Sequence, residues 1–133
     1  MKKIIVIDGQ GGNIGKQLVK RIREELPDVY IRAVGTNSTA TGNMLKAGAD
    51  EAATGENAVV VAAKQADIIT GPIGIIVPDA LLGEVTVTMA KAVSDSKAVK
   101  VLIPMNKCDI MIAGVQDKSI SELIETAIRQ IVL

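Results

Sequence analysis

The feature that most constrains the fold is an uninterrupted run of β-branched residues at 4–7, followed by a glycine-rich turn and a helical pattern. Such a run is typical of a strand buried on both faces, as in the interior of a parallel sheet. After the turn, Ile14, Leu18, Ile22 and Leu26 recur every four residues and form one apolar helix stripe. Since parallel strands need crossover connections, a strand followed by a helix predicts an α/β fold.

The rest of the chain repeats this alternation. Further strands are predicted at 29–34, 51–53, 67–70 and 99–103, helices at 38–47, 54–63 and 84–94, an irregular turn at 71–74, and a last helix opened by a capping box at 119–122. The pattern predicts a three-layer, doubly wound, mostly parallel sheet of the Rossmann-like kind, in the order 3-2-1-4-5 with right-handed crossovers. Ligands in such sheets bind at the carboxyl ends of the strands, here between the first and the fourth.

A sixth strand is predicted at 110–113. Only a handful of residues separate it from the fifth strand, whereas a parallel return needs a dozen or more. The sixth strand is therefore expected to pair antiparallel at the edge of the sheet.

Composition restricts the classes of function. The 133 residues suit one domain, 1–133, and 15 Lys and Arg balance 15 Asp and Glu, which argues against a nucleic-acid or acidic-membrane partner. With no histidine and one cysteine, no metal site is expected. The N-terminal apolar run ends at Asp8, and no apolar stretch approaches membrane-helix length, so we expect a cytoplasmic protein. The 48% apolar content and the apolar run at 58–63 favour a homo-oligomer, for example a dimer.

The glycine-rich turn is the main candidate for binding a small phosphate-bearing ligand. Its free N–H groups and the dipole of the following helix suit an anion. The expected binding residues are Gly9, Gln10, Gly11, Gly12, Asn13 and Ile14. Gly15 is expected to let the helix pack closely against the strand. The spacing G-x-G-x-x-x-G is one residue longer than the dinucleotide fingerprint, and the alternative is a tight turn without a ligand.

Two further helix starts and the end of the fourth strand extend this candidate site. Enzymes that prefer NAD usually place a carboxylate after the second strand, but this chain has the neutral donors Thr36, Asn37 and Ser38, which favours NADP or a mononucleotide. The alternative for this cluster is a helix N-cap alone. Thr54 is the expected N-cap of the third helix, and Gly71 and Pro72 either admit a ligand or shape a turn.

Several polar groups keep more than one interpretation. Asp8 has three possible roles, which are to cap the helix, to bind a ribose or to carry a proton, and the capping role is favoured. Lys16 either completes a phosphate clamp or is a solvated helix residue, and Glu56 either interacts with the helix dipole or takes part in catalysis. Asn106 and Lys107 either form a hairpin turn, which is favoured, or face the ligand cleft, and Cys108 is interpreted as a small hydrophobic residue rather than a nucleophile. No catalytic set stands out, so the sequence leaves open whether the protein is an enzyme.

Five segments, 7–12, 35–37, 44–49, 53–57 and 71–75, together resemble a small bacterial family known only as a domain of unknown function. The resemblance covers nearly the whole chain. It implies a Rossmann-like domain, but neither an activity nor catalytic residues. The leading hypothesis is a module that binds a nucleotide or dinucleotide (NADP, NAD or a mononucleotide). The alternatives are a small NAD(P)-dependent oxidoreductase or accessory subunit, and an oligomeric scaffold without a ligand.

Overall fold

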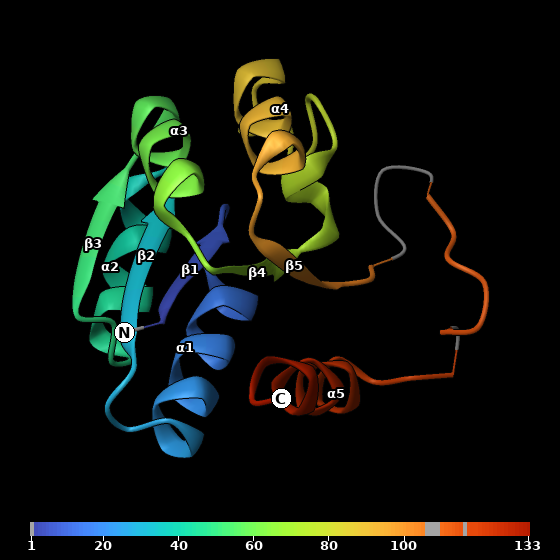
Figure 1. The fold of residues 1–133 in the computed structure, drawn as a ribbon. Helices are drawn as coiled ribbons and strands as arrows, with labels where there is room; N and C mark the ends of the chain where they lie inside the picture. Colours follow the sequence, from blue (N-terminus) through green and yellow to red (C-terminus); the bar gives the residue numbers. More distant parts are fainter. Residues whose placement is uncertain (1, 106–109, 116) are drawn as a thin grey trace.

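The computed structural model describes residues 2–105, 110–115 and 117–133, and its elements alternate strictly between strand and helix over the first two thirds of the chain (Figure 1). In chain order the elements are β1 (Lys3–Asp8), α1 (Asn13–Glu25), β2 (Tyr30–Gly35), α2 (Ser38–Lys46), β3 (Glu51–Thr54), α3 (Glu56–Gln65), β4 (Ile68–Pro72), the 3₁₀ helix η1 (Ile73–Ile76), α4 (Val87–Asp95), β5 (Val99–Ile103) and α5 (Ile120–Ile131). No described helix has the length and apolar character that crossing a bilayer requires.

The five strands form one parallel sheet in the order β3-β2-β1-β4-β5, as the sequence predicts. Ile4 of β1 is in register with Ile31 of β2 on one side and with Ile68 of β4 on the other. The central strand thus has neighbours on both edges. The carboxyl ends of β1, β2 and β4 meet at the same edge of the sheet, where ligands of such folds bind.

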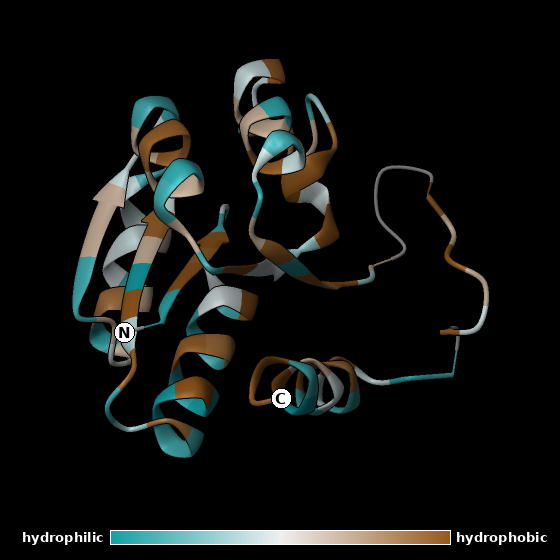
Figure 2. Cartoon of the chain, viewed as in Figure 1, coloured by the Kyte–Doolittle hydropathy of each residue, from teal (hydrophilic) through white to brown (hydrophobic). Residues whose placement is uncertain are grey.

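Alternate residues of β1 are buried in two separate cores, one on each face of the sheet. Ile4 and Val6 pack with α1, α2 and α5, while Ile5 and Ile7 pack with α3, η1 and α4. In Figure 1 these helices flank the sheet as two layers, and in Figure 2 β1 is almost entirely hydrophobic. Burying each of these side chains stabilises the fold by about 1.5–3 kcal/mol, which is why the run carries no polar alternation.

The predicted antiparallel sixth strand is wrong. Residues 110–113 belong to the connection between β5 and α5, all five strands are parallel, and Met111 is 82% exposed. A run of four apolar residues predicts burial, but here Ile110 and Ile112 are half-buried and Met111 and Ala113 are exposed. The edge of β5 has no further strand partner among the described residues.

Three other boundaries differ from the prediction. The helix expected at 84–94 begins at Val87, because Thr86 is its N-cap and accepts a hydrogen bond from the Met89 amide at 3.1 Å. Thr54 ends β3 and does not cap α3, whose N-cap is Gly55 at φ +105°, a conformation that favours glycine. Residues 71–74 are not an irregular turn, since β4 continues through Pro72 and η1 follows directly.

Candidate functional site

A hollow of about 390 Å³ lies at the carboxyl end of β1, over the glycine-rich turn. We call it the turn hollow. The polar part of its lining, which we call the polar wall, is formed by Asp8, Gly9, Gln10, Gly11, Gly12, Asn13, Gln17 and Ser121, and the apolar part, the apolar wall, by Ile14, Pro72, Leu81, Met105 and Ile120. Asp8 is the one charged side chain among the described residues of this lining. The volume falls in the range of about 300–1,000 Å³ that is usual for small-molecule sites.

The amide groups of the turn are only partly available to a ligand. Gly9 and Gly15 donate to the Asp8 carboxylate, each at 2.7 Å, Gln10 donates to Glu84 Oε1 at 2.9 Å, and Gly12 donates to the Gly9 carbonyl. Within the described part of the chain, the N–H groups of Gly11 and Asn13 have no acceptor, and both residues are exposed in the turn hollow. The turn therefore offers two free donors rather than a full cradle of amides.

Asp8 acts within the turn as a helix-capping residue. Its side chain is 5% exposed, and its two oxygens accept the amides of Gly9 and Gly15, the latter in the first turn of α1. Burial raises the pKa of Asp8 above its ordinary value, the amides of Gly15 and Gly9 act in the opposite direction, and the Glu84 carboxylate raises it further. Asp8 thus occupies amides that a phosphate takes in other folds of this kind.

A carboxylate from a distant part of the chain lies at the end of β2. Glu84, from the connection between η1 and α4, accepts hydrogen bonds at its Oε1 from Thr36 Oγ1 at 2.6 Å, Asn37 Nδ2 at 2.8 Å and the Gln10 amide. Burial raises the pKa of Glu84, but these three bonds outweigh it and leave the pKa below its ordinary value. Glu84 is separated from Thr36 by 48 residues and belongs to no recognisable motif, so no local pattern indicates this contact.

The structure brings together some of the predicted binding residues and separates others. The turn hollow collects Gly9, Gln10, Gly11, Gly12, Asn13, Ile14 and Pro72. Thr36 and Asn37 face Glu84, and Asn37 also caps α2 through the Ala40 amide. Ser38 begins α2, and Thr54 pairs with the Thr41 hydroxyl. Gly71 lies against β1, where an added Cβ would meet the Ile7 carbonyl oxygen at 2.1 Å.

The other polar groups singled out in the sequence lie away from the turn hollow or outside the described residues. Lys16 is exposed on α1, and Glu56 is exposed in the first turn of α3. Asn106, Lys107 and Cys108 lie outside the described residues. Among the residues that the structure describes, no group of three or more acidic or cysteine side chains gathers at a possible metal position.

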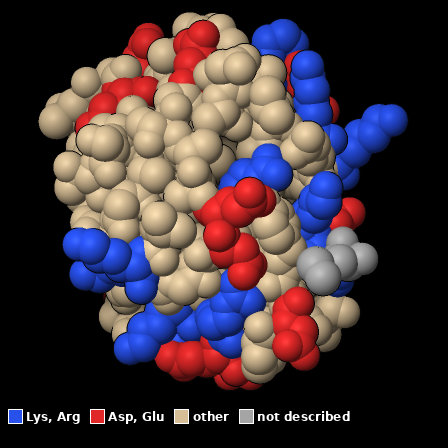
Figure 3. All heavy atoms as spheres, turned by 90° about the vertical axis from the view of Figure 1, so that its left-hand side faces the viewer, with Lys and Arg blue, Asp and Glu red and all other residues tan. Residues whose placement is uncertain are grey.

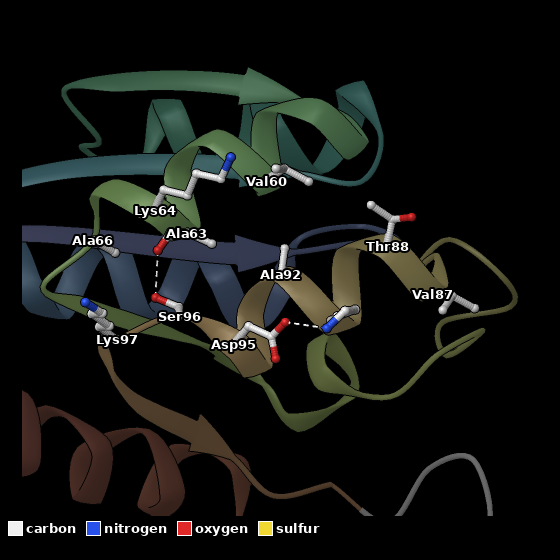
Figure 4. Close-up of a pocket in the computed structure, with 11 residues that line it drawn as sticks. Val60, Ala63, Lys64, Ala66, Val87, Thr88, Ala92, Asp95, Ser96 and Lys97 are labelled. Atoms are coloured by element: carbon white, nitrogen blue, oxygen red, sulfur yellow. Dashed lines mark hydrogen bonds and ion pairs between the residues drawn. The ribbon is translucent and has the colours of Figure 1, made fainter.

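A second concavity, the α3–α4 groove, measures about 640 Å³ (Figure 4). It lies between helices α3 and α4, on the face of the sheet away from α1 and α5. Its lining contains small and apolar residues and several charged ones: Val60, Ala63, Ala66, Val87 and Ala92, with Lys64, Lys91, Asp95 and Lys97. On the face shown in Figure 3, basic and acidic side chains are intermixed, and a broad area has no charged side chains.

Comparisons with known proteins place the chain in a family and identify a structural neighbour. The model of a domain of unknown function, DUF3842, matches residues 3–132, as the sequence motifs predict. A solved structure with a similar fold is the dodecameric FMN-dependent UbiX-like decarboxylase from Escherichia coli O157:H7, at a TM-score of 0.55 and 16% identity. The alignment covers 100% of this chain and 96% of that one, and at this identity the likeness shows the Rossmann-like fold alone. No curated protein matches the chain.

Proposed function

We propose that this chain, which belongs to the DUF3842 family of unknown function, binds a mononucleotide in the turn hollow. The observation that carries the proposal is the division of the hollow into a polar and an apolar wall. Gly11 and Asn13 supply free amides on one side, while Pro72, Leu81 and Met105 supply an apolar surface on the other. A phosphate on the amides and a planar base against the apolar wall match these two surfaces.

The arrangement at the end of β2 favours a mononucleotide over a dinucleotide. In dinucleotide-binding folds the ligand extends from the turn toward the second strand, where a ribose binds. Here the donors of Thr36 and Asn37 are occupied by Glu84, and neither residue lines the turn hollow. While Glu84 occupies this place, a 2′-phosphate there would lie beside its carboxylate, so the sequence-based preference for NADP is not carried further. The structural neighbour is described as FMN-dependent, which makes FMN the first mononucleotide to test.

A thermal-unfolding screen tests the proposal. The purified chain is heated with FMN, AMP, ATP, coenzyme A, NAD or NADP, and with riboflavin and adenosine as matched compounds that lack the phosphate. A mononucleotide is expected to raise the midpoint by mass action, with a gain of about 2.7 kcal/mol at a hundredfold excess over Kd, and its phosphate-free partner less so. A response to none of these ligands would contradict the proposal and favour a scaffold.

Gly11→Val and Gly42→Ala form a matched pair for this screen. A Cβ at either position meets no atom within 4 Å, so both variants are expected to fold. Only Gly11 lines the turn hollow, where the valine side chain would obstruct the two free amides. Gly11→Val is therefore expected to abolish the ligand-dependent shift and Gly42→Ala to preserve it. An equal shift in both variants would locate the ligand elsewhere.

We further propose that the chain self-associates through the α3–α4 groove, with a dimer as the smallest assembly. Val87, which lines this groove on α4, is 59% exposed, and the small residues Ala63 and Ala92 in the lining allow a partner to approach closely. The structural neighbour is described as dodecameric. Light scattering at micromolar concentration tests this: the wild type is expected to exceed monomer mass, and Val87→Lys to reduce the mass. Val99→Lys, at an equally exposed position of β5, is the control.

A further inference from the structure

Three hydrogen-bond donors from two separate segments converge on one oxygen atom beside the glycine-rich turn. The Thr36 hydroxyl, the Asn37 side-chain amide and the Gln10 backbone amide lie 2.6, 2.8 and 2.9 Å from Glu84 Oε1. The other carboxylate oxygen, Oε2, has no hydrogen-bond partner among the described residues. Three donors directed at a single oxygen are the arrangement by which proteins hold an oxyanion.

The backbone makes room for this oxygen. An added Cβ at Gly9 would lie 2.4 Å from Thr36 Oγ1 and 2.9 Å from Glu84 Oε1, so a side chain there would exclude the carboxylate. The carboxylate therefore reaches the turn only because position 9 is glycine. A carboxylate or phosphate oxygen of another molecule would use the same space.

The segment that carries Glu84 has an unusual backbone. Asp79, Leu81 and Leu82 adopt φ of +66°, +57° and +57°, a region unfavourable for residues with a Cβ, and Leu82 is 95% exposed. Its base is anchored independently, since Ala80 and Val85 are buried and the Asp79 amide donates to the Val85 carbonyl at 2.7 Å. Removing the Glu84 carboxylate therefore leaves the base of the segment packed.

We propose that Gln10, Thr36 and Asn37 form an oxyanion-binding subsite that Glu84 fills from within the chain, and that a carboxylate or phosphate group of a ligand binds there when Glu84 is displaced. The subsite lies at the carboxyl ends of β1 and β2. Thr36, Asn37 and Glu84 do not line the turn hollow, and Gln10 is the residue that the subsite and the hollow share, so the two proposals are tested with different variants. Without a ligand, Glu84 Oε1 occupies the three donors.

Chemical rescue of Glu84→Ala tests the subsite. The variant is expected to unfold at a lower temperature than the wild type, and acetate or inorganic phosphate, against chloride at equal ionic strength, is expected to restore at least half of the loss with saturable dependence. Rescue is counted as the gain beyond that of two controls, the wild type, whose subsite is filled, and Asp28→Ala, which loses an exposed carboxylate between α1 and β2. Phosphate bound at the free amides of the turn hollow would stabilise all of these proteins alike. Rescue by acetate alone assigns the subsite to carboxylates, and rescue by phosphate alone to phosphate groups.

Adding Thr36→Val to Glu84→Ala removes one donor and is expected to weaken the rescue at least several-fold. The proposal is overturned if neither anion stabilises Glu84→Ala more than Asp28→Ala, or if Thr36→Val leaves the rescue unchanged. Should Glu84→Ala fail to fold, Glu84→Gln retains an acceptor oxygen in place. In that variant acetate or phosphate is expected to shift the side-chain amide resonance of Asn37, which does not line the turn hollow, saturably, and an unmoved resonance with both anions would overturn the proposal as well.

Discussion

At the scale of single residues, the glycines of the first turn differ in what they do. Gly9 and Gly15 are required by packing, because a Cβ at either position would overlap neighbouring atoms, whereas Gly11 faces open space. Gly12 has a positive φ of 72° and lies against the Ala40 backbone. The motif G-x-G-x-x-x-G is thus explained mainly by close packing, and only its exposed middle part remains available to a ligand.

Gly15 gives a direct test of the packing role. A Cβ there would lie 2.5 Å from Met44 Sδ and 2.8 Å from Asp8 Cβ, so Gly15→Ala is expected to destabilise the fold by about 1–3 kcal/mol. Gly42→Ala, in the interior of α2 with free space around it, is expected to stabilise by about 0.5–1 kcal/mol. Urea denaturation measures both free energies of unfolding, and equal effects in the two variants would refute the packing argument.

Asp8 makes stability depend on pH in an unusual direction. Because burial holds its pKa in the folded state above its ordinary value, the folded chain binds more protons than the unfolded chain in the window between these two values. The contribution of Asp8 to stability therefore falls as pH rises through this window. Asp8→Asn, which does not titrate, should lose less stability relative to the wild type at pH 7 than at pH 4, as measured by urea denaturation. A difference that grows with pH would contradict the raised pKa.

The sequence allowed some of these residue roles to be predicted and not others. Gly15 and Asn37 follow from a local rule, since helix packing and N-capping involve neighbours in the motif. Glu84 follows from none, because its contacts with Thr36 and Asn37 form only after η1 and the connection to α4 have folded back onto the turn. The sequence also predicts that the amides of the turn are free to bind an anion. In the structure the Asp8 carboxylate accepts two of them, those of Gly9 and Gly15.

At the scale of elements, the pattern of apolar residues predicted strands and helices well where turn or capping residues also indicated both ends of the element. The run at 4–7 and the helix stripe after it are observed as β1 and α1. The segment at 110–113 had only apolar composition to support it and no partner pattern, and it is not a strand. The start of α4 was predicted too early because Thr86, and not a residue near Glu84, caps the helix.

Helix α5 illustrates how a well-marked element is attached. Its capping box is present, with the Ser119 hydroxyl accepting the Glu122 amide and the Glu122 carboxylate accepting the Ser119 amide. Arg21 of α1 holds Glu125 with two hydrogen bonds of 2.6 and 2.9 Å. Together with the buried Ile128, these contacts fix α5 beside α1.

Ser119→Ala is expected to lower the free energy of unfolding by about 1 kcal/mol, because the Glu122 amide at the start of α5 loses its acceptor, the Ser119 hydroxyl. Amide hydrogen exchange in the first turn of α5 should accelerate. Exchange in β1 should change only as much as the global free energy of unfolding changes. Ser94→Ala, an exposed serine inside α4, is the control and should have little effect. Equal costs for the two variants would show that the cap contributes nothing.

At the scale of the whole molecule, the candidate site lies where the strand order reverses, beside the central strand β1. The strands β2 and β3 lie on one side of β1 and the strands β4 and β5 on the other (Figure 1). The order of the strands was predictable because crossovers are right-handed and the first strand was recognisably central. The position of Glu84 beside Thr36 was not predictable, since it depends on how the long connection between η1 and α4 folds back onto the turn.

The most direct test of the binding site follows the backbone amides of the turn by ¹H–¹⁵N NMR during titration with FMN. The account predicts saturable shifts of the Gly11 and Asn13 amides, which have no acceptor among the described residues, and an unchanged Gly42 amide in α2. Riboflavin, which lacks the phosphate, should move these two signals less. If FMN binds while the Gly11 and Asn13 amides stay unmoved, or if no mononucleotide moves them, the turn hollow is not the ligand site.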